Sequence, residues 1–408
     1  MIQPLNPIVQ KYGGSSLSTL EKLRRVARKI IESTEGGARP LVAVVSAMGN
    51  TTSELLGRAL EVSSSPSRRE LDMLLSSGER MSTALLAMAI EEAGHSAISL
   101  TGPQSGILTD DLHANATIKD VRPDRVIAEL AAGHVVIVAG FQGLGSSGEV
   151  TTLGRGGSDT SALALAGALG AECCEIYSDV PGVYTADPRI VDEPLHLKQL
   201  DSALMAEYAL HGARVLHPAC IAMARQKGVA IHARSTFGEP RFTRIRCEAD
   251  LAFSACATEA PPIVGVASRK SRIYVRARRG ETGLYERALE CLGDEDGLLL
   301  QRSDSMEHLL VDIEDVPDPE RVTAKLQERL RDASVTTRLA SVSVVSHRAV
   351  TPELLERVGG VLERSSTRPP VAYRRAHSIT CAVPAADRAD AVRAIHSHFI
   401  EQPLAVQG

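Results

Sequence analysis

The sequence lacks several features that mark common classes of protein. It has no tryptophan and only 3% aromatic residues, which disfavours surfaces that stack nucleic-acid bases. Its seven cysteines form no CxxC pair, so neither a disulfide framework nor a zinc site is expected. Basic residues are not in excess, because 45 Lys and Arg stand against 50 Asp and Glu, whereas nucleic-acid binders usually carry a basic face. No apolar run approaches the ~18–20 residues of a membrane-spanning helix.

The remaining composition is that of a globular protein with several domains. The chain has 408 residues, of which 44% are hydrophobic and 23% charged, enough for two or three domains with buried cores. Its first residues lack the basic and then apolar layout of a signal peptide. We therefore expect a cytoplasmic protein that acts on small molecules, with neither a nucleic acid nor a membrane as partner.

Up to about residue 237, apolar strand-like runs alternate with amphipathic helical patterns. The predicted strands are Ile8–Lys11, Leu41–Val45, Ala97–Leu100, His134–Ala139, Cys174–Tyr177 and Val229–Ala233. Because these runs are almost continuously apolar, they predict a mainly parallel sheet covered on both faces, an α/β sandwich of three layers. Ser18 and Glu21 resemble a capping box at the start of the first helix. Ligands of such a sheet bind at the strand ends, on loops that lead into helices.

The last third of the chain has a different pattern. Residues 238–262 are mixed and end in Glu-Ala-Pro-Pro, which predicts a linker. Beyond them, strand and helix patterns follow the order βαββαβ over 263–336 and again over 337–408, with Leu309 and Ile379 about 70 residues apart at equivalent places. We predict two such modules in tandem. Their open sheet edges favour pairing between the two copies or between subunits.

Two short segments combine small and hydroxyl residues where a strand gives way to a helix. In Lys11–Ser16, two glycines let backbone N–H groups approach an anion at a helix N-terminus, and the lysine is suited to neutralise a phosphoryl group in transfer. For a glycine pair alone, a tight turn with a solvated lysine is the favoured interpretation. In Ser46–Thr52, hydroxyl groups are suited to cup a phosphate or carboxylate, although such residues also simply start helices.

The densest signal is Thr151–Thr160, with sequence TTLGRGGSDT. Arg155 is suited to hold a carboxylate in a bidentate fork, and the glycines that follow it let the backbone approach substrate or phosphates. Asp159 is suited to position lysines and metal, or to cap the helix that follows, and these roles are compatible. A run of this composition is seldom only a loop, so we favour the functional interpretation.

Two weaker candidates remain. Ser178–Arg189 combines a Pro-Gly turn with an aromatic ring for a base or ribose and an arginine for phosphate, but it is equally a rigid turn. Glu79 follows a glycine inside a helical pattern, where a glutamate usually lies on a solvated face. The histidines form no metal-binding set, and we predict that His396 and His398 lie at the surface.

Taken in order, these segments resemble the aspartate kinases of the amino acid kinase family. The matching segments are KYGGSS (11–16), VVSAMGNTT (44–52), SSGER (76–80), VAGFQG (138–143), TTLGRGGSDTSA (151–162), EIYSDVPGVYTADPR (175–189) and GARVLHP (212–218). The resemblance covers about residues 8–236 and is closest to compact aspartokinases. It implies an amino acid kinase domain over 1–237 with a three-layer αβα sandwich, followed after the linker by two ferredoxin-like ACT modules over 263–336 and 337–408.

The resemblance implies ATP-dependent phosphorylation of the β-carboxylate of L-aspartate to 4-phospho-L-aspartate, with ADP as the second product and Mg²⁺ as the ion. This is the first step toward lysine, threonine and methionine, or toward a dedicated specialised metabolite. It also implies a cytoplasmic homodimer or tetramer assembled through the ACT-like modules. A carboxylate is already a nucleophile, so positioning and charge neutralisation, rather than a strong base, supply most of the rate.

The roles of individual residues follow from the motifs of the family. Lys11 is expected to stabilise the γ-phosphoryl group in transit, Glu79 to meet the ammonium and Arg155 to clamp the α-carboxylate. The catalytic residues so implied are Lys11, Asp159 and Arg214. The substrate contacts so implied are Ser46, Thr51, Glu79, Arg155 and Ser158. The ATP contacts so implied are Lys11, Gly13, Gly14, Ser15, Gly156, Gly157, Ser178, Asp179, Tyr184, Arg189 and Arg214. No side chain is assigned as a metal ligand.

The sequence departs from the family pattern at several positions. Arg214 replaces a lysine; arginine keeps the charge but is planar, so turnover is expected to be lower if this cation contacts the phosphate. Ser15 for threonine is a mild change. Asn50 and Ser53 stand where close relatives often carry aspartate, which removes negative charge near the amino-acid pocket, and Ala219 stands where arginine is usual. The stretches 279–283 and 347–351 lack the Pro-Gly turn at which ACT modules bind amino-acid effectors, so we expect weakened or absent inhibition by lysine and threonine.

Two alternatives to an active aspartokinase remain open. One is a kinase of the same fold for a substituted aspartate or another amino acid. The other is a catalytically weak regulatory subunit, which Arg214 favours and the complete GRGGSD segment opposes.

Overall fold

The computed structural model describes residues 6–35, 38–238, 240–247, 263–278, 283–292, 298–302, 305–314, 319–365, 369 and 371–401. The chain divides into two compact units. The first comprises Met1–Val183, Leu197–Met205 and Arg214–Ala252, and the second comprises Tyr184–His196, Ala206–Ala213 and Phe253–Gly408. Two short segments that precede residue 214 thus belong to the second unit. Most of the predicted linker 238–262 lies outside the described residues.

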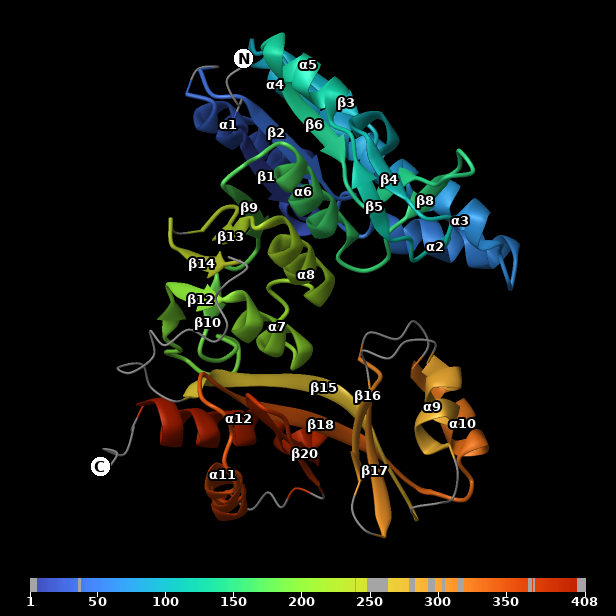
Figure 1. The fold of residues 1–408 in the computed structure, drawn as a ribbon, viewed down its shortest axis with the longest axis vertical. Coiled ribbons are helices and arrows are strands. Elements are labelled where there is room, and N and C mark those ends of the chain that lie inside the picture. The colour runs from blue at the N-terminus through green and yellow to red at the C-terminus, as the bar shows by residue number, and fades with distance from the viewer. Residues whose placement is uncertain are drawn as a thin grey trace. The chain divides into compact units, whose positions relative to one another are not determined.

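An eight-stranded sheet forms the centre of the first unit (Figure 1). Its strands in spatial order are β12 (Gln199–Asp201), β14 (Phe242–Arg246), β13 (Ala230–Ser235), β9 (Cys173–Ser178), β1 (Ile8–Tyr12), β2 (Leu41–Val45), β6 (Val135–Ala139) and β3 (Ala97–Leu100). All neighbouring pairs are parallel except β13 with β14. The six predicted strands and the mainly parallel sheet are therefore confirmed.

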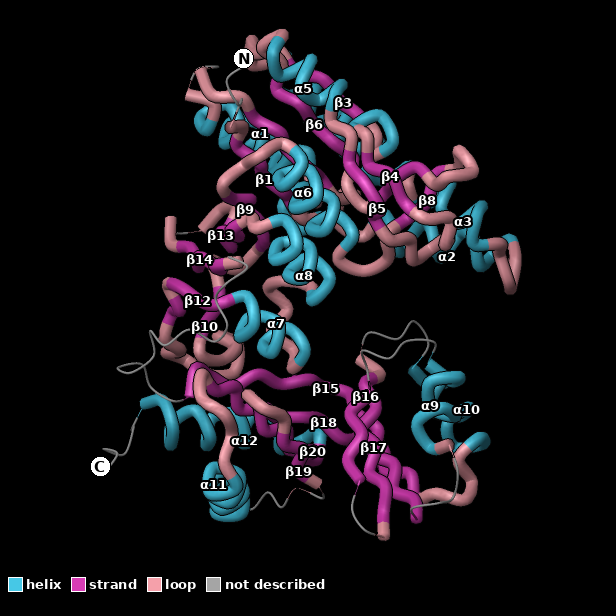
Figure 2. Tube along the Cα trace, viewed as in Figure 1, coloured by secondary structure: helices cyan, strands magenta, loops and turns pink. Residues whose placement is uncertain are grey.

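Helices cover both faces of this sheet. The helices of the unit are α1 (Leu20–Ser33), α2 (Thr51–Val62), α3 (Arg68–Leu75), α4 (Ser77–Glu92), α5 (Asp124–Ala131), α6 (Gly157–Ala168) and α8 (Pro218–Lys227). Apolar residues of α1 and α4, such as Ile30 and Ile90, pack on Ala43 and Ile137 of the sheet. On the opposite side α6 and α8 lie side by side, as Figures 1 and 2 show. Three layers result, as the sequence predicts.

The start of α1 differs in detail from the prediction. The N-cap is Thr19, whose hydroxyl accepts a hydrogen bond from the Lys22 N–H at 3.2 Å. Ser18 instead ends the short 3₁₀ helix Gly14–Leu17, and its hydroxyl donates to the Ser15 carbonyl. The predicted capping box was therefore wrong by one residue, because the 3₁₀ turn takes up Ser18 before the α-helix begins.

A smaller four-stranded sheet extends the first unit. Its strands in order are β5 (Ile118–Val121), β4 (Ile107–Thr109), β7 (Gln142–Leu144) and β8 (Val150–Thr152). A two-stranded sheet joins β10 (Val183–Tyr184) to β11 (His196–Leu197), and α7 spans Ser202–Leu210. Within the residues described, no helix has both the length and the apolar character needed to cross a bilayer.

The second unit is built on an antiparallel six-stranded sheet. Its strands in order are β16 (Leu298–Arg302), β17 (Met306–Asp312), β15 (Ile263–Arg278), β18 (Ser334–Ser346), β20 (Ser378–Pro384) and β19 (Ala372–Arg374). Its helices are α9 (Leu284–Leu292), α10 (Pro319–Arg329), α11 (Pro352–Arg364) and α12 (Arg388–His396), followed by a π-helical turn at Ser397–Glu401. This sheet carries the two predicted ferredoxin-like repeats.

The second repeat takes one strand from the first part of β15. Residues Ile263–Arg269 pair with Ser341–Ser346 of β18, and Ile263 and Val266 belong to the core that α11 and α12 cover. The later residues of β15, such as Val275, instead pack in the core beneath α9 and α10. The two modules are thus interleaved rather than strictly in tandem. The predicted boundary between residues 336 and 337 falls inside β18, and the exact domain limits stay predictions.

One of the two histidines predicted at the surface is buried. His396 has 0% exposure; its Nε2 lies 2.8 Å from the Thr185 hydroxyl and its Nδ1 2.8 Å from a Glu401 carboxylate oxygen. Spacing along a helix shows which residues share a face but not which face another segment covers. The surface prediction for His396 was therefore wrong.

Candidate active site

The motif loops meet at the carboxyl ends of neighbouring parallel strands. The Ser46 N–H donates to the Tyr12 carbonyl at 3.1 Å, and the Gly49 N–H donates to the Gly14 carbonyl at 3.0 Å. The loop after β6 joins them through the Gly140 N–H and the Val45 carbonyl, also at 3.0 Å. Crevices at this edge of a parallel sheet are where ligands of such folds bind.

Two glycines of these loops are required by space and backbone conformation. A Cβ on Gly14 would lie 2.7 Å from the Ala47 carbonyl oxygen, so the first two loops approach too closely for any other residue. Gly156 is the N-cap of α6 with φ of 68°, and a Cβ there would lie 2.4 Å from Cβ of His217. The left-handed conformation and the close contact both favour glycine. The His217 segment therefore packs directly on the glycine-rich loop.

Lys11 and Asp159 form an ion pair at the centre of the converging loops. Lys11 Nζ lies 2.5 Å from Asp159 Oδ1, and the two side chains are only 11% and 13% exposed. Lys11 lies near the end of β1, and Asp159 lies in the first turn of α6. The N-cap of α6 is a glycine without a side chain, and the Asp159 carboxylate in the first turn pairs with the lysine. The pair leaves ammonium hydrogens of Lys11 for an anionic ligand.

Glu79 is a buried carboxylate with half of its hydrogen-bonding capacity unused. It lies in the first turn of α4 and is 3% exposed, so the solvated-face alternative was wrong. Its Oε1 accepts the Ala47 N–H at 3.0 Å, whereas its Oε2 is buried without a hydrogen-bond partner. Burial raises the pKa of Glu79 to about 7, although the hydrogen bond from Ala47 opposes the shift. A buried and unpartnered acceptor is suited to a cationic ligand.

The other four predicted substrate residues lie in or beside the motif loops. Thr51 begins α2, and its hydroxyl donates to the Met48 carbonyl at 2.7 Å. Ser158 is buried, and its Cβ would lie 2.8 Å from a Cβ placed on Gly140. Arg155 is exposed at the turn before α6, and Ser46 is half-buried beside Ala47. All five predicted substrate residues lie in the first unit, and their contacts with a substrate stay predictions.

The predicted nucleotide residues divide between the two units. Ser178 ends β9, and its hydroxyl lies 3.3 Å from both the backbone nitrogen and the carbonyl oxygen of Val180. Asp179 follows it and is exposed. Tyr184 and Arg189 belong to the second unit. There the Tyr184 ring meets His196 edge-on at 5.2 Å, and Asp187 holds the Arg189 guanidinium through two bonds of 2.9 Å. Arg214 is exposed in the segment that leads to His217. The contacts of these residues with ATP stay predictions.

Thr236 is a site residue that sequence reasoning missed. Its hydroxyl lies 2.6 Å from the Ser16 hydroxyl and donates to the Ser178 carbonyl at 3.0 Å. Thr236 therefore joins the segment after β1 to the end of β9. No glycine or charged residue marks it, and only its place just after β13 indicates it. Among the residues described, no three His, Cys, Asp or Glu side chains gather in a way that would hold a metal ion.

Comparison with known proteins agrees with this arrangement. Residues 6–235 match the model of the family described as "Amino acid kinase family". Aspartokinase from Mycolicibacterium smegmatis is 51% identical over 240 residues, which are 59% of this chain and 57% of that protein. Aspartokinase from Corynebacterium efficiens is 42% identical over 373 residues, 87% of each chain.

A solved structure extends the likeness of fold to almost the whole chain. Escherichia coli aspartokinase III, crystallised with aspartate and ADP, superposes with a TM-score of 0.75 at 24% identity and covers 96% of this chain and 99% of its own. At that identity the likeness concerns the fold alone. The match to the mycobacterial relative, by contrast, spans less than two thirds of that protein.

Proposed function

Because the chain belongs to the aspartokinases of the amino acid kinase family, we propose that it transfers the γ-phosphoryl group of ATP to the β-carboxylate of L-aspartate. The products are 4-phospho-L-aspartate and ADP. The observation that carries this proposal is Glu79, a buried carboxylate with one unpartnered oxygen, whose other oxygen accepts the Ala47 N–H in the loop after β2. It supplies a place for an ammonium group, and the Lys11–Asp159 pair supplies a cation suited to a phosphoryl group.

Aspartate is held by charge at both ends of its α-amino acid group. Glu79 accepts hydrogen bonds from the ammonium, and Arg155 forms a two-point contact with the α-carboxylate. Thr51, Ser46 and Ser158 line the space between them. The β-carboxylate is then directed toward the phosphoryl donor, and it needs no base because it is ionised at neutral pH.

Charge neutralisation supplies the remaining catalytic effect. Lys11, held in place by Asp159, stabilises the negative charge on the transferring group, and Arg214 adds a second cation. Mg²⁺ enters as part of the Mg·ATP substrate, whose phosphate oxygens provide hard ligands for it. Backbone N–H groups of the glycine loops bind the phosphates. The proposed nucleotide contacts within the first unit are Gly13, Gly14, Ser15, Gly156, Gly157, Ser178 and Asp179.

Regulation and assembly form a second part of the proposal. The stretch 347–351 lacks a Pro-Gly turn, and residues 279–282 of the other stretch lie outside the described residues. We expect a cytoplasmic homodimer or tetramer that lysine and threonine inhibit weakly or not at all. Titration of each amino acid, and of both together, against activity tests this. Strong inhibition at millimolar concentration would contradict it.

The activity is tested by ADP release from Mg·ATP with a panel of acceptors. L-aspartate should support turnover with formation of an acyl phosphate that hydroxylamine traps, and L-glutamate should not. Turnover with 3-substituted aspartates only would indicate a different acceptor. No turnover with any acceptor, together with retained nucleotide binding, would indicate a regulatory subunit and contradict the proposal.

A further inference from the structure

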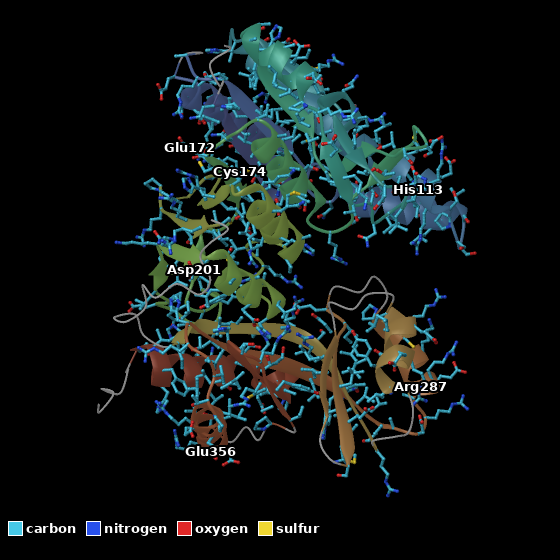
Figure 3. The ribbon with its side chains drawn as sticks, in the orientation of Figure 1. His113, Glu172, Cys174, Asp201, Arg287 and Glu356 are labelled. Atoms are coloured by element: carbon cyan, nitrogen blue, oxygen red, sulfur yellow. The ribbon has the colours of Figure 1, made fainter. Side chains whose placement is uncertain are left out.

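The carboxylate of Asp72 is a buried hydrogen-bonding centre outside the predicted site. It lies on α3 with 0% exposure. Its Oδ1 accepts the Thr152 hydroxyl at 2.5 Å and the Ala114 N–H at 3.1 Å, and its Oδ2 lies 2.6 Å from His113 Nδ1. His113 is labelled in Figure 3 in the region of α2, α3 and β8. A buried charge persists in a fold only when such partners compensate its desolvation.

Each end of this network continues into a substrate-binding segment. Asp72 itself is followed within one turn by Ser76, whose N–H donates to the Asp72 carbonyl at 3.0 Å, and then by α4 with Glu79. Thr152 ends β8, and the next three residues lead to Arg155. One carboxylate therefore links the segments that carry the proposed ammonium and α-carboxylate contacts.

The third partner segment supports the glycine-rich loop from beside it. Ala114, whose N–H binds Asp72, has φ of 69°, a left-handed conformation that is unusual for alanine. Its neighbour Asn115 places its side-chain oxygen 2.7 Å from where a Cβ of Gly154 would be. The Ala116 N–H donates to the Thr152 carbonyl at 2.8 Å. The same carboxylate thus also holds the segment on which the loop before Arg155 rests.

We propose that Asp72 is a positioning residue that sets the separation of Glu79 and Arg155 through its bond to Thr152. This role rests on the proposed function, since it assumes that those two side chains bind the two ends of an α-amino acid. A carboxylate suits the task because it is an acceptor with capacity for several donors at once. Uncoupling it from Thr152 frees the loop of Arg155 without touching Arg155 itself.

Thr152 and its neighbour Thr151 provide a matched pair of variants. Thr151 is equally buried on the same strand, but its hydroxyl bonds to Thr109 at 2.6 Å and not to Asp72. T152V and T151V each exchange one buried hydroxyl for a methyl group of similar size. Both are expected to lower stability, and T152V more so, because it takes a donor from a carboxylate whereas T151V takes a hydrogen-bond partner from a neutral hydroxyl. Only T152V uncouples Asp72 from the loop.

The first readout is independent of substrate. T152V should increase hydrogen exchange at amides of residues 153–157, and T151V should not. The second readout is kinetic: T152V should raise KM for aspartate about tenfold, as expected for the loss of precise positioning, with KM for ATP unchanged. T152S, which keeps the hydroxyl, should restore both readouts. If T152V does not fold, the comparison of T152S with T152A isolates the hydroxyl in the same way.

The positioning role would be overturned if T152V and T151V changed hydrogen exchange and the KM for aspartate equally. It would also be overturned if T152V kept both the wild-type exchange at residues 153–157 and the wild-type KM for aspartate. A wild-type enzyme that turned over no aspartate would instead contradict the proposed function. In that case the exchange experiment would still show whether the bond between Asp72 and Thr152 orders residues 153–157, because it needs no substrate.

Discussion

Replacement of Glu79 by glutamine should alter both substrate binding and stability, in opposite directions. Burial raises the pKa of Glu79 from 4.5 to about 7, and its Oε2 has no hydrogen-bond partner. A shift of that size corresponds to about 3 kcal/mol of free energy. Because the proposed contact with the ammonium group of aspartate requires ionised Glu79, the KM for aspartate should rise roughly tenfold between pH 8 and pH 6. In E79Q the KM for aspartate should be high at both pH values.

The stability of the free enzyme should follow the same titration. A carboxyl group whose pKa is raised on folding contributes stability that is complete below the unfolded pKa of 4.5 and is lost as the pH rises through about 7. At pH 8 the wild type therefore bears the full cost of a buried charge, and E79Q removes it. The variant should be more stable than wild type by up to about 3 kcal/mol at pH 8 and about equally stable below pH 4.5.

The assay combines initial rates of ADP formation with chemical unfolding, both across pH 6 to 8. A matched control is E92Q, since Glu92 is exposed at the other end of α4 and should change neither quantity. A KM for aspartate in the wild type that stayed constant from pH 8 to pH 6 would refute the reasoning. An E79Q variant less stable than wild type at pH 8 would refute it as well.

Three further substitutions test the loops. Lys11→Ala should lower kcat by at least about a hundredfold, because it removes the cation at the transferring group, while calorimetry should still detect ADP binding. Gly14→Ala should lower the free energy of unfolding by ~1–3 kcal/mol and raise the KM for ATP, since its Cβ would lie 2.7 Å from the Ala47 carbonyl oxygen. The control is Gly57→Ala, whose Cβ would have no atom within 4 Å. It should instead stabilise α2 by ~0.5–1 kcal/mol. Arg214→Lys should raise kcat severalfold, because an ammonium is a more compact charge; an unchanged kcat would remove that residue from the catalytic step.

The fold of the first unit could be predicted because its strands are visible in the sequence as short, continuous apolar runs. Runs such as Leu41–Val45 are apolar at every position, and the structure buries all five residues of that strand. The loops were also marked, since Gly14 and Gly156 occupy places where only glycine fits. Strand pairing in the second unit could not be predicted from the sequence. The alternation of apolar and polar residues along β15 does not show that its two halves belong to different modules.

The burial of charged side chains depended on contacts between distant parts of the chain. Glu79 is typical in sequence of a residue on a solvated face, and only the approach of Ala47 and the loops around it makes it buried. Asp72 and Thr152 are 80 residues apart, and no local pattern connects them. His396 is enclosed by Thr185, which lies 211 residues earlier. Such contacts follow from the tertiary fold rather than from helix periodicity.

The chemical identity of the product shows which carboxylate of aspartate accepts the phosphoryl group, and we propose that it is the β-carboxylate. Borohydride reduces an acyl phosphate to the corresponding alcohol. The product of Mg·ATP and L-aspartate should therefore yield homoserine after reduction. Recovery of 3-amino-4-hydroxybutanoate, the alcohol from the α-carboxylate, or of unchanged aspartate despite ADP release, would contradict the account.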